Sequence, residues 1–204
     1  MTRAARRKLS TLADSEIVSD FAQRGFTLLE LLIVITIIIA LAGLVLATVG
    51  YAQKKGARSR AEAEIAAMSA ACEGYKADNG IYPNNSDTNG LNPTSQGDPA
   101  TYSAASLYLY EQLSGDTTAN RQPTGKSYMA FKPNMLLPAP PATSTVTAIR
   151  DPFGNSYGYS TANNRDANPT GAAGSGYNPT FDLWSTAGNT GTSTSDKAQW
   201  IKNW

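Results

Sequence analysis

The chain contains 204 residues, with 17 lysine and arginine residues against 16 acids, one cysteine and no histidine. A net charge of +1 lacks the basic surplus that is typical of nucleic-acid-binding domains, so we expect no nucleic-acid partner. The lack of histidine excludes histidine-dependent acid–base and nucleophilic catalysis, and a single cysteine excludes an intrachain disulfide and a zinc site of several thiolates.

The N-terminal part of the chain changes abruptly in composition. Residues 1–25 are polar and carry charges of both signs, whereas residues 26–52 are apolar apart from Glu30 and a few threonine, glycine and glutamine residues. At about 1.5 Å per residue, residues 26–49 would form a helix of roughly 36 Å, which exceeds the ~30 Å hydrocarbon core of a bilayer. The composition therefore predicts one membrane-spanning helix.

This helix is expected to continue beyond the apolar segment. Residues 53–80 contain no proline and are rich in Ala, Glu, Lys and Arg, which have high helix propensity. Apolar side chains recur at helical spacing and form one stripe: Ala61, Ile65, Met68, Cys72 and Tyr75. Because Cys72 lies on this stripe, we interpret it as a core residue rather than a reactive thiol. The DNG sequence at 78–80, ahead of Pro83, predicts the helix end, so residues 26–79 would form one helix.

The remainder of the chain, residues 81–204, is rich in Gly, Ser, Thr, Asn, Pro and Tyr. A short helix is predicted at 104–113, strands at 127–131, 145–149, 156–160 and 180–185, a hairpin turn at 151–155, and loops at 84–100, 115–126 and 163–179. We expect the apolar side chains of the strands, with Tyr and Trp, to pack on the stripe of the long helix. The predicted fold class is α+β, with a long N-terminal helix packed on a small C-terminal antiparallel sheet. The predicted division is a membrane-spanning segment at 26–52, an amphipathic helix at 53–80 and a globular domain at 81–204.

Glu30 is the one acid inside the apolar segment. A charged side chain at the centre of a bilayer costs on the order of 3 kcal/mol. Glu30 lies about one turn from the start of the segment, so it could reach the headgroup layer as a tolerated interfacial acid. A functional interpretation is also open: cleavage between Gly25 and Phe26 would create an amine with a pKa of about 7.7–8.0. Pairing of that amine with Glu30 of an adjacent copy would select the register between chains.

Residues 25–30, GFTLLE, resemble the prepilin-type cleavage and methylation motif of type IV pilins and type II secretion pseudopilins. Residues 75–83, YKADNGIYP, resemble the helix end of the major pseudopilin of type II secretion, and residues 151–159, DPFGNSYGY, resemble its hairpin. Residues 182–185, DLWS, and 203–204, NW, are similar to its last strand and tail.

The resemblance implies a cytoplasmic leader at 1–25, cleavage between Gly25 and Phe26 by a prepilin peptidase, N-methylation of Phe26, and a role for Glu30 in subunit register. It also implies a single-pass inner-membrane protein whose C-terminal domain is periplasmic. Its implied partners are further copies of the chain, other pseudopilins, membrane lipid and an inner-membrane secretion platform. The copies would form a periplasmic filament that drives protein export.

The chain departs from this family at three places. Position 47 is Ala where many pilin-type helices carry Pro, and the region 84–145 is longer than in short major pseudopilins. The family's last loop often holds calcium through several aspartates, whereas here residues 185–191 contain no acid and Asp196 alone follows. We therefore expect no metal and no cofactor.

Alternative interpretations remain at this point. Arg6-Arg7 and the small-residue sequence Ala40-Leu41-Ala42 resemble parts of a secretory signal, which would give a mature chain beginning at Gly43. A pilin of a type IV pilus is a second alternative, although such pilins commonly carry a C-terminal cysteine pair that is absent here.

A third alternative is a membrane-tethered enzyme or binding module. Its candidate carboxylates are Asp151, Asp182 and Asp196, with Tyr157 and Tyr159 nearby in sequence. These acids lack a paired catalytic spacing, and acids in turns usually cap or are solvated. No phosphate-binding loop or nucleophile elbow is present in the sequence, so we expect no enzymatic activity.

Overall fold

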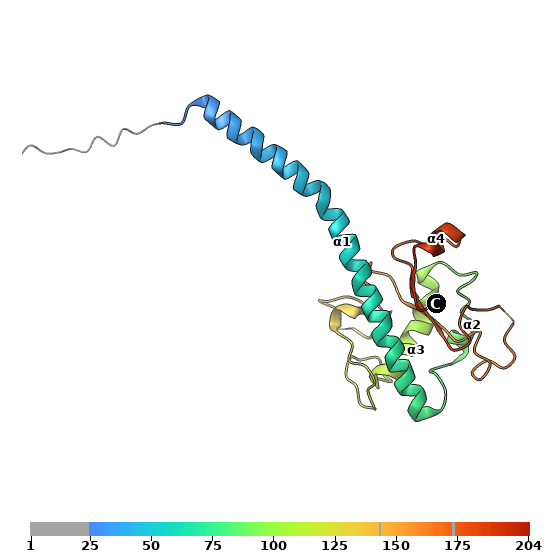
Figure 1. Ribbon diagram of the computed structural model, residues 1–204. Coiled ribbons are helices and arrows are strands. Elements are labelled where there is room, and N and C mark those ends of the chain that lie inside the picture. The colour runs from blue at the N-terminus through green and yellow to red at the C-terminus, as the bar shows by residue number, and fades with distance from the viewer. Residues whose placement is uncertain (1–24, 143, 173) are drawn as a thin grey trace, which may run out of the picture. The chain divides into compact units, whose positions relative to one another are not determined.

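A computed structural model describes residues 25–142, 144–172 and 174–204. Of the predicted leader, Gly25 alone lies within this range, and residues 1–24 lie outside the described residues. The longest element is α1, Leu28–Asn79, which Figure 1 draws from blue to green. The chain divides into two compact units between Ala47 and Thr48, so the two parts of α1 are described separately.

The apolar part of α1 leaves its side chains uncovered. Among the described residues, α1 is the one helix long and apolar enough to cross a membrane, and its most apolar 18-residue stretch is entirely unburied. Large apolar side chains such as Leu28, Ile39 and Leu46 are more than half exposed. The core helix of a soluble domain would bury such residues, so this segment is suited to a lipid environment or to contact with other helices.

The polar part of α1 buries the predicted stripe. Ala61, Ile65, Met68 and Cys72 are at most 4% exposed, and Tyr75 is partly buried against the same core. Burial raises the pKa of the Cys72 thiol well above its usual range, as expected of a core cysteine. The helix ends as its sequence predicts: the Gly80 amide donates to the Lys76 carbonyl at 2.8 Å, and Gly80 has a left-handed φ of +82°.

A second helix, α3, Ser103–Ser114, covers the other side of this core and confirms the helix predicted at 104–113. Within the described residues, four smaller helical elements were not predicted: α2 at Ser86–Gly90, the 3₁₀ turns η1 at Pro99–Tyr102 and η2 at Pro133–Met135, and α4 at Thr194–Ala198. Helix α2 lies within the loop predicted at 84–100, and η1 begins at its end. Their starts follow local rules, because Asn85 forms a capping box with Thr88 and Pro99 occupies the first turn of η1.

In the described part of the chain, five short strands confirm the α+β class but form two antiparallel sheets instead of one. Strand β1, Leu136–Leu137, pairs with β2, Ala148–Ile149; strands β3, Gly158–Ser160, β4, Asp182–Ser185, and β5, Ile201–Lys202, pair in that order. The predicted hairpin turn at 151–155 is confirmed, because Arg150 and Ser156 form a bridge on either side of it.

The strand predicted at 127–131 is wrong. The amides of Tyr128 and Met129 both donate to the carbonyl of Leu113, at 2.8 and 3.0 Å. These amides therefore satisfy the C-terminal end of α3, where helical carbonyls lack intrahelical partners, and are not available to a sheet.

Strand β4 separates two hydrophobic clusters. Leu183 joins the core below α1, whereas its neighbour Trp184 packs on the opposite face with Tyr102 and Trp200. The expectation that tryptophan packs on the helix stripe is therefore wrong, because successive side chains of a strand point to opposite faces. Gly158 pairs with Trp184 across the sheet, and a Cβ placed on it would lie 2.2 Å from Cε2 of that indole.

The loop after α3 is organised by a buried carboxylate. Asp116 accepts hydrogen bonds from the Tyr110 hydroxyl at 2.8 Å and from the Arg121 amide at 2.7 Å, with further bonds from Thr118 and Asn120. Burial alone would raise the pKa of Asp116, but these donors together hold it below its usual value. The loop predicted at 115–126, within the longer region 84–145, is therefore ordered around one charge.

Candidate functional site

The predicted cleavage site lies just outside helix α1. Residues 25–27 have no regular structure, and the helix begins at Leu28. A side chain added at Gly25 would meet no described residue within 4 Å, and Phe26 is 81% exposed. None of the described residues therefore shields the Gly25–Phe26 bond from an enzyme.

Glu30 takes part in a capping box at the start of α1. Its carboxylate Oε2 accepts hydrogen bonds from the backbone amide and the hydroxyl of Thr27, both at 3.2 Å, and the Glu30 amide donates to Thr27 Oγ1 at 3.1 Å. The Thr27 carbonyl accepts from the Leu31 amide at 3.1 Å, which completes the first turn. This arrangement was not predicted, although Thr-x-x-Glu ahead of an apolar run is a recognised signal of it.

The capping box leaves part of the Glu30 carboxylate free. Oxygen Oε2 accepts both bonds from Thr27, whereas Oε1 accepts none from any residue that the structure describes. The side chain is also exposed. Glu30 can therefore cap its own helix and, with the other oxygen, accept a hydrogen bond from a cation on another molecule.

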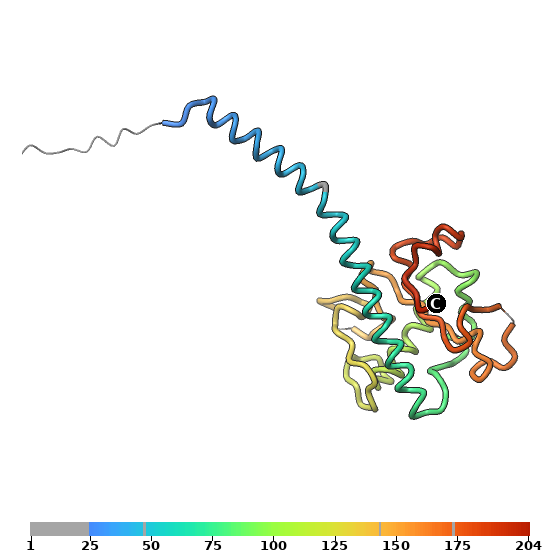
Figure 2. Tube along the Cα trace, in the orientation of Figure 1, coloured from blue at the N-terminus to red at the C-terminus, as the bar shows by residue number. Residues whose placement is uncertain are grey.

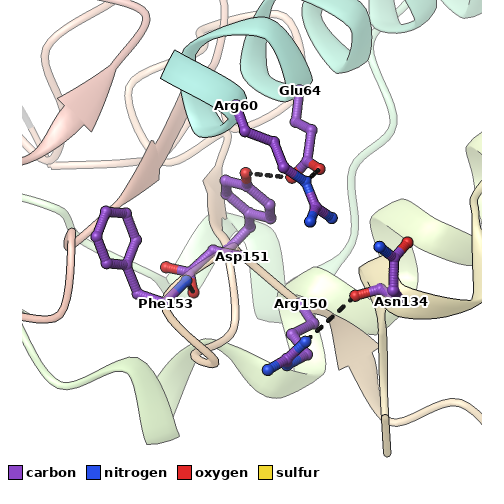
Figure 3. A network of polar contacts seen from close by, with 7 residues as sticks. Arg60, Glu64, Asn134, Arg150, Asp151 and Phe153 are labelled. Atoms are coloured by element: carbon purple, nitrogen blue, oxygen red, sulfur yellow. Dashed lines mark hydrogen bonds and ion pairs between the residues drawn. The ribbon is translucent and has the colours of Figure 1, made fainter. Parts of the chain in front are cut away.

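A buried polar network attaches the hairpin to the polar part of α1 (Figure 3). Glu64 accepts a hydrogen bond from the Tyr157 hydroxyl at 2.8 Å and from Arg60 Nε at 2.7 Å. Burial and the nearby Glu64 charge raise the pKa of Tyr157 well above its usual range, so this hydroxyl stays protonated and donates. Arg150, at the base of the hairpin, donates to the Asn134 carbonyl at 3.5 Å. These bonds hold the hairpin in place and occupy both carboxylate oxygens of Glu64.

The three carboxylates considered for an enzyme each accept hydrogen bonds from other groups of the protein. Asp151 accepts from the amides of Phe153 and Asn155 at 3.0 and 2.8 Å and from Ser185 Oγ at 2.5 Å. Burial raises the pKa of Asp151 against the effect of these bonds.

Asp182 accepts from the amides of Tyr177 and Asn178, each at 2.8 Å, and Asp196 caps helix α4, Thr194–Ala198, through Ser193. All three acids therefore stabilise turns. The tyrosines beside them are also structural: Tyr157 binds Glu64, and Tyr159 donates to the Pro83 carbonyl at 2.8 Å.

The C-terminal loop, in which the family resemblance would place calcium, is held by protein groups. The Lys197 ammonium donates to the Thr94 carbonyl, and Gly191 lies against Gly97, so this loop runs beside the segment around residue 95 (Figure 2). Within the described residues no three His, Cys, Asp or Glu side chains are grouped to hold a metal ion.

Comparison with known proteins bears directly on the N-terminal motif. Residues 20–46 match the family described as the prokaryotic N-terminal methylation motif. The chain is 40% identical over 91 residues to the type II secretion system core protein G of Pectobacterium carotovorum subsp. carotovorum. This alignment covers 42% of this chain and 57% of the relative. It is 44% identical over 61 residues to the protein of the same name from Escherichia coli (strain K12), which covers 30% of this chain and 42% of the relative.

The chain is therefore similar, over part of its length, to type II secretion system core protein G. The predicted resemblance to the prepilin-type motif and to type II secretion pseudopilins is confirmed by these matches. The chain spans 42% to 57% of the length of the curated relatives named here, and no solved structure matches it. The relatives are named for a secretion system and not for an enzyme, in agreement with the expectation that the chain is not an enzyme.

Proposed function

We propose that this pseudopilin-like chain is a structural subunit of a type II secretion pseudopilus. A prepilin peptidase cleaves the bond between Gly25 and Phe26 and methylates the new amine of Phe26. The mature subunits then polymerise, with their own copies and with other pseudopilins, into a filament that drives protein export. The leader is cytoplasmic, the helix is anchored in the inner membrane, and the C-terminal domain is periplasmic.

One observation carries this proposal: an accessible Gly25–Phe26 bond is followed at once by a capped helix with an uncovered apolar surface. A signal sequence would be discarded together with that surface, and a simple anchor would not need an acid in its first turn. A filament subunit has a use for both, because the apolar side chains pack against neighbouring helices once the helix leaves the lipid.

The geometry at Glu30 defines what the acid would do in the filament. Thr27 keeps one carboxylate oxygen as a cap, and the other oxygen belongs to an exposed side chain. After cleavage, the amine of Phe26 in the adjoining subunit carries the complementary charge. Because an unpaired charge in the filament core is costly, their pairing favours one axial stagger between subunits over others.

The partners follow from the same proposal. They are the prepilin peptidase, further copies of the chain, other pseudopilins, the inner-membrane platform of the secretion system and membrane lipid. Work for assembly comes from a separate protein of the platform.

The proposal is tested by the mass of the mature N-terminus in cells that produce or lack the peptidase. We expect a chain that begins with N-methylated Phe26 in the first case and an intact leader in the second. Gly25→Asp should leave the uncut chain in the membrane. A mature chain that begins at Gly43 would instead identify a secreted protein and contradict the proposal.

A further inference from the structure

The basic side chains that follow the apolar segment line a groove. Lys54, Lys55 and Arg58 lie on α1 and face the hairpin residue Phe153 and the loop residues 187–189, around a cavity of about 720 Å³. Tyr51 and Gln199 complete its walls, and every one of these residues belongs to the second compact unit. None of the groove's lining residues is an acid.

The groove carries unneutralised positive charge. Among the described residues, neither Lys54 nor Lys55 forms an ion pair or a hydrogen bond through its side chain. Arg58 is held in place, because Nη1 donates to the Gln199 carbonyl at 2.9 Å and Nε lies 3.4 Å from Glu62 Oε1. Two free ammonium groups and one positioned guanidinium thus face a common space, an arrangement that complements an anion with several oxygen atoms.

The position of these cations along the chain indicates which kind of anion they would bind. Lys54 follows Val49, the last large aliphatic residue of the apolar segment, by five residues, which corresponds to roughly 7.5 Å of helix. The headgroup layer on each face of a bilayer is of about this thickness. Tyr51 is 73% exposed between the two, as is typical of aromatic residues at a membrane interface.

The shape and chemistry of the groove fit a headgroup with an apolar body behind it. Phe153 and Ala187 supply apolar surface beside the cations, and the amide groups of Asn189 and Gln199 supply hydrogen-bonding groups. A bare phosphate would gain nothing from contact with the apolar wall, whereas the glycerol backbone and first methylenes of a phospholipid would pack against it.

We propose that this groove binds the headgroup of an anionic phospholipid in the leaflet from which the C-terminal domain emerges. The proposal rests on the membrane anchoring of the proposed function but adds a specific lipid site to it. Binding the lipid holds the hairpin and the C-terminal loop against the bilayer surface, and the site must be vacated when a subunit leaves the membrane.

The test uses the full chain in detergent and native mass spectrometry, with phosphatidylglycerol and phosphatidylcholine of identical acyl chains as probes. We expect phosphatidylglycerol to bind more tightly. K54Q/K55Q should weaken its binding by about thirtyfold, since each cation contributes about 1 kcal/mol near an anionic surface and 1.4 kcal/mol is tenfold. This variant retains Arg58 and its bond to the C-terminal loop, so the fold is left intact.

The matched control is K126Q/K132Q, which removes the same charge from side chains that do not line the groove. Its phosphatidylglycerol affinity should equal that of the unmodified chain. An equal loss of phosphatidylglycerol affinity in both variants would show that net charge alone determines binding, and would overturn the proposal. Equal affinity of the unmodified chain for the two lipids would also overturn the proposal, as would displacement of the lipid by inorganic phosphate at the same concentration. A K54Q/K55Q variant that changes its oligomeric mass but not its lipid binding would overturn it too.

Failure of the underlying function would be seen separately. Carbonate extraction of cell membranes reports whether the chain is anchored, whichever lipid it prefers. An anchored chain without lipid preference contradicts the groove proposal alone, whereas a chain released by carbonate contradicts the anchoring on which both depend.

Discussion

The two roles of Glu30 can be separated by one substitution. Glu30→Gln retains an oxygen that accepts the hydrogen bonds of Thr27, because glutamine serves in a capping box as glutamate does. It removes the negative charge that would meet the neighbouring amine. Glu30→Ala removes both functions, and Thr27→Val removes the cap but leaves the charge.

The expected magnitudes differ enough to be resolved. Loss of a helix cap costs about 1 kcal/mol, and here the cap is exposed, so the start of α1 frays without loss of the helix. Removing one partner of a buried ion pair costs about 3–5 kcal/mol. At 1.4 kcal/mol per tenfold, E30Q should therefore weaken subunit association by roughly 100-fold or more, whereas T27V should weaken it by less than about tenfold.

The assay measures the mass of sedimented filaments, with electron microscopy to confirm their form. Circular dichroism of the solubilised chain reports the helix, and mass spectrometry first establishes that each variant is processed. We expect E30A and E30Q to be processed and helical but poor in filaments. Filaments of E30Q as abundant as those of the unmodified chain would refute the charge argument and leave Glu30 as a cap.

Three further outcomes are expected. Gly158→Ala should lower the free energy of unfolding by about 1–3 kcal/mol, because the added Cβ overlaps the buried ring of Trp184. The control Gly90→Ala should leave the free energy of unfolding unchanged, because a Cβ there has no described neighbour within 4 Å. Equal melting temperatures of the two variants would contradict this packing. Asp116 has a lowered pKa, so its stabilisation is present above about pH 4 and is lost as the pH falls toward the folded-state value. Asp116→Asn should therefore be less stable at neutral pH and lose less on acidification, as urea titrations at several pH values would show. Calcium or EDTA should leave the melting temperature unchanged, because residues 185–199 are held by protein groups, and a clear rise with calcium would reveal a site.

Much of the N-terminal half could be predicted because its signals are local. The length of the apolar segment, the stripe that ends at Tyr75 and the turn at Gly80 depend on residues within a few positions of each other, and the structure agrees with each. The capping box of Thr27 and Glu30 belongs to the same class of signal. The role of Glu30 toward a second molecule is a different matter, because a single chain contains only one of the two charges.

The C-terminal half depended on contacts between residues far apart in the chain. Residues 127–131 have a strand-like sequence, yet the amides of Tyr128 and Met129 bond to the end of α3. Strands β1 and β5 form because β2 and β4, more than ten residues away in the chain, provide strand edges with which they pair. Which face of β4 receives Leu183 and which receives Trp184 was likewise set by the elements packed on each side. The sequence by itself determined the long helix, its apolar surface and its N-terminal motif, since hydrogen bonding and periodicity along one helix need no partner. Only the tertiary structure decided the pairing of the short strands and brought Lys54, Lys55 and Arg58 opposite the hairpin, because those arrangements exist only when distant segments share one core.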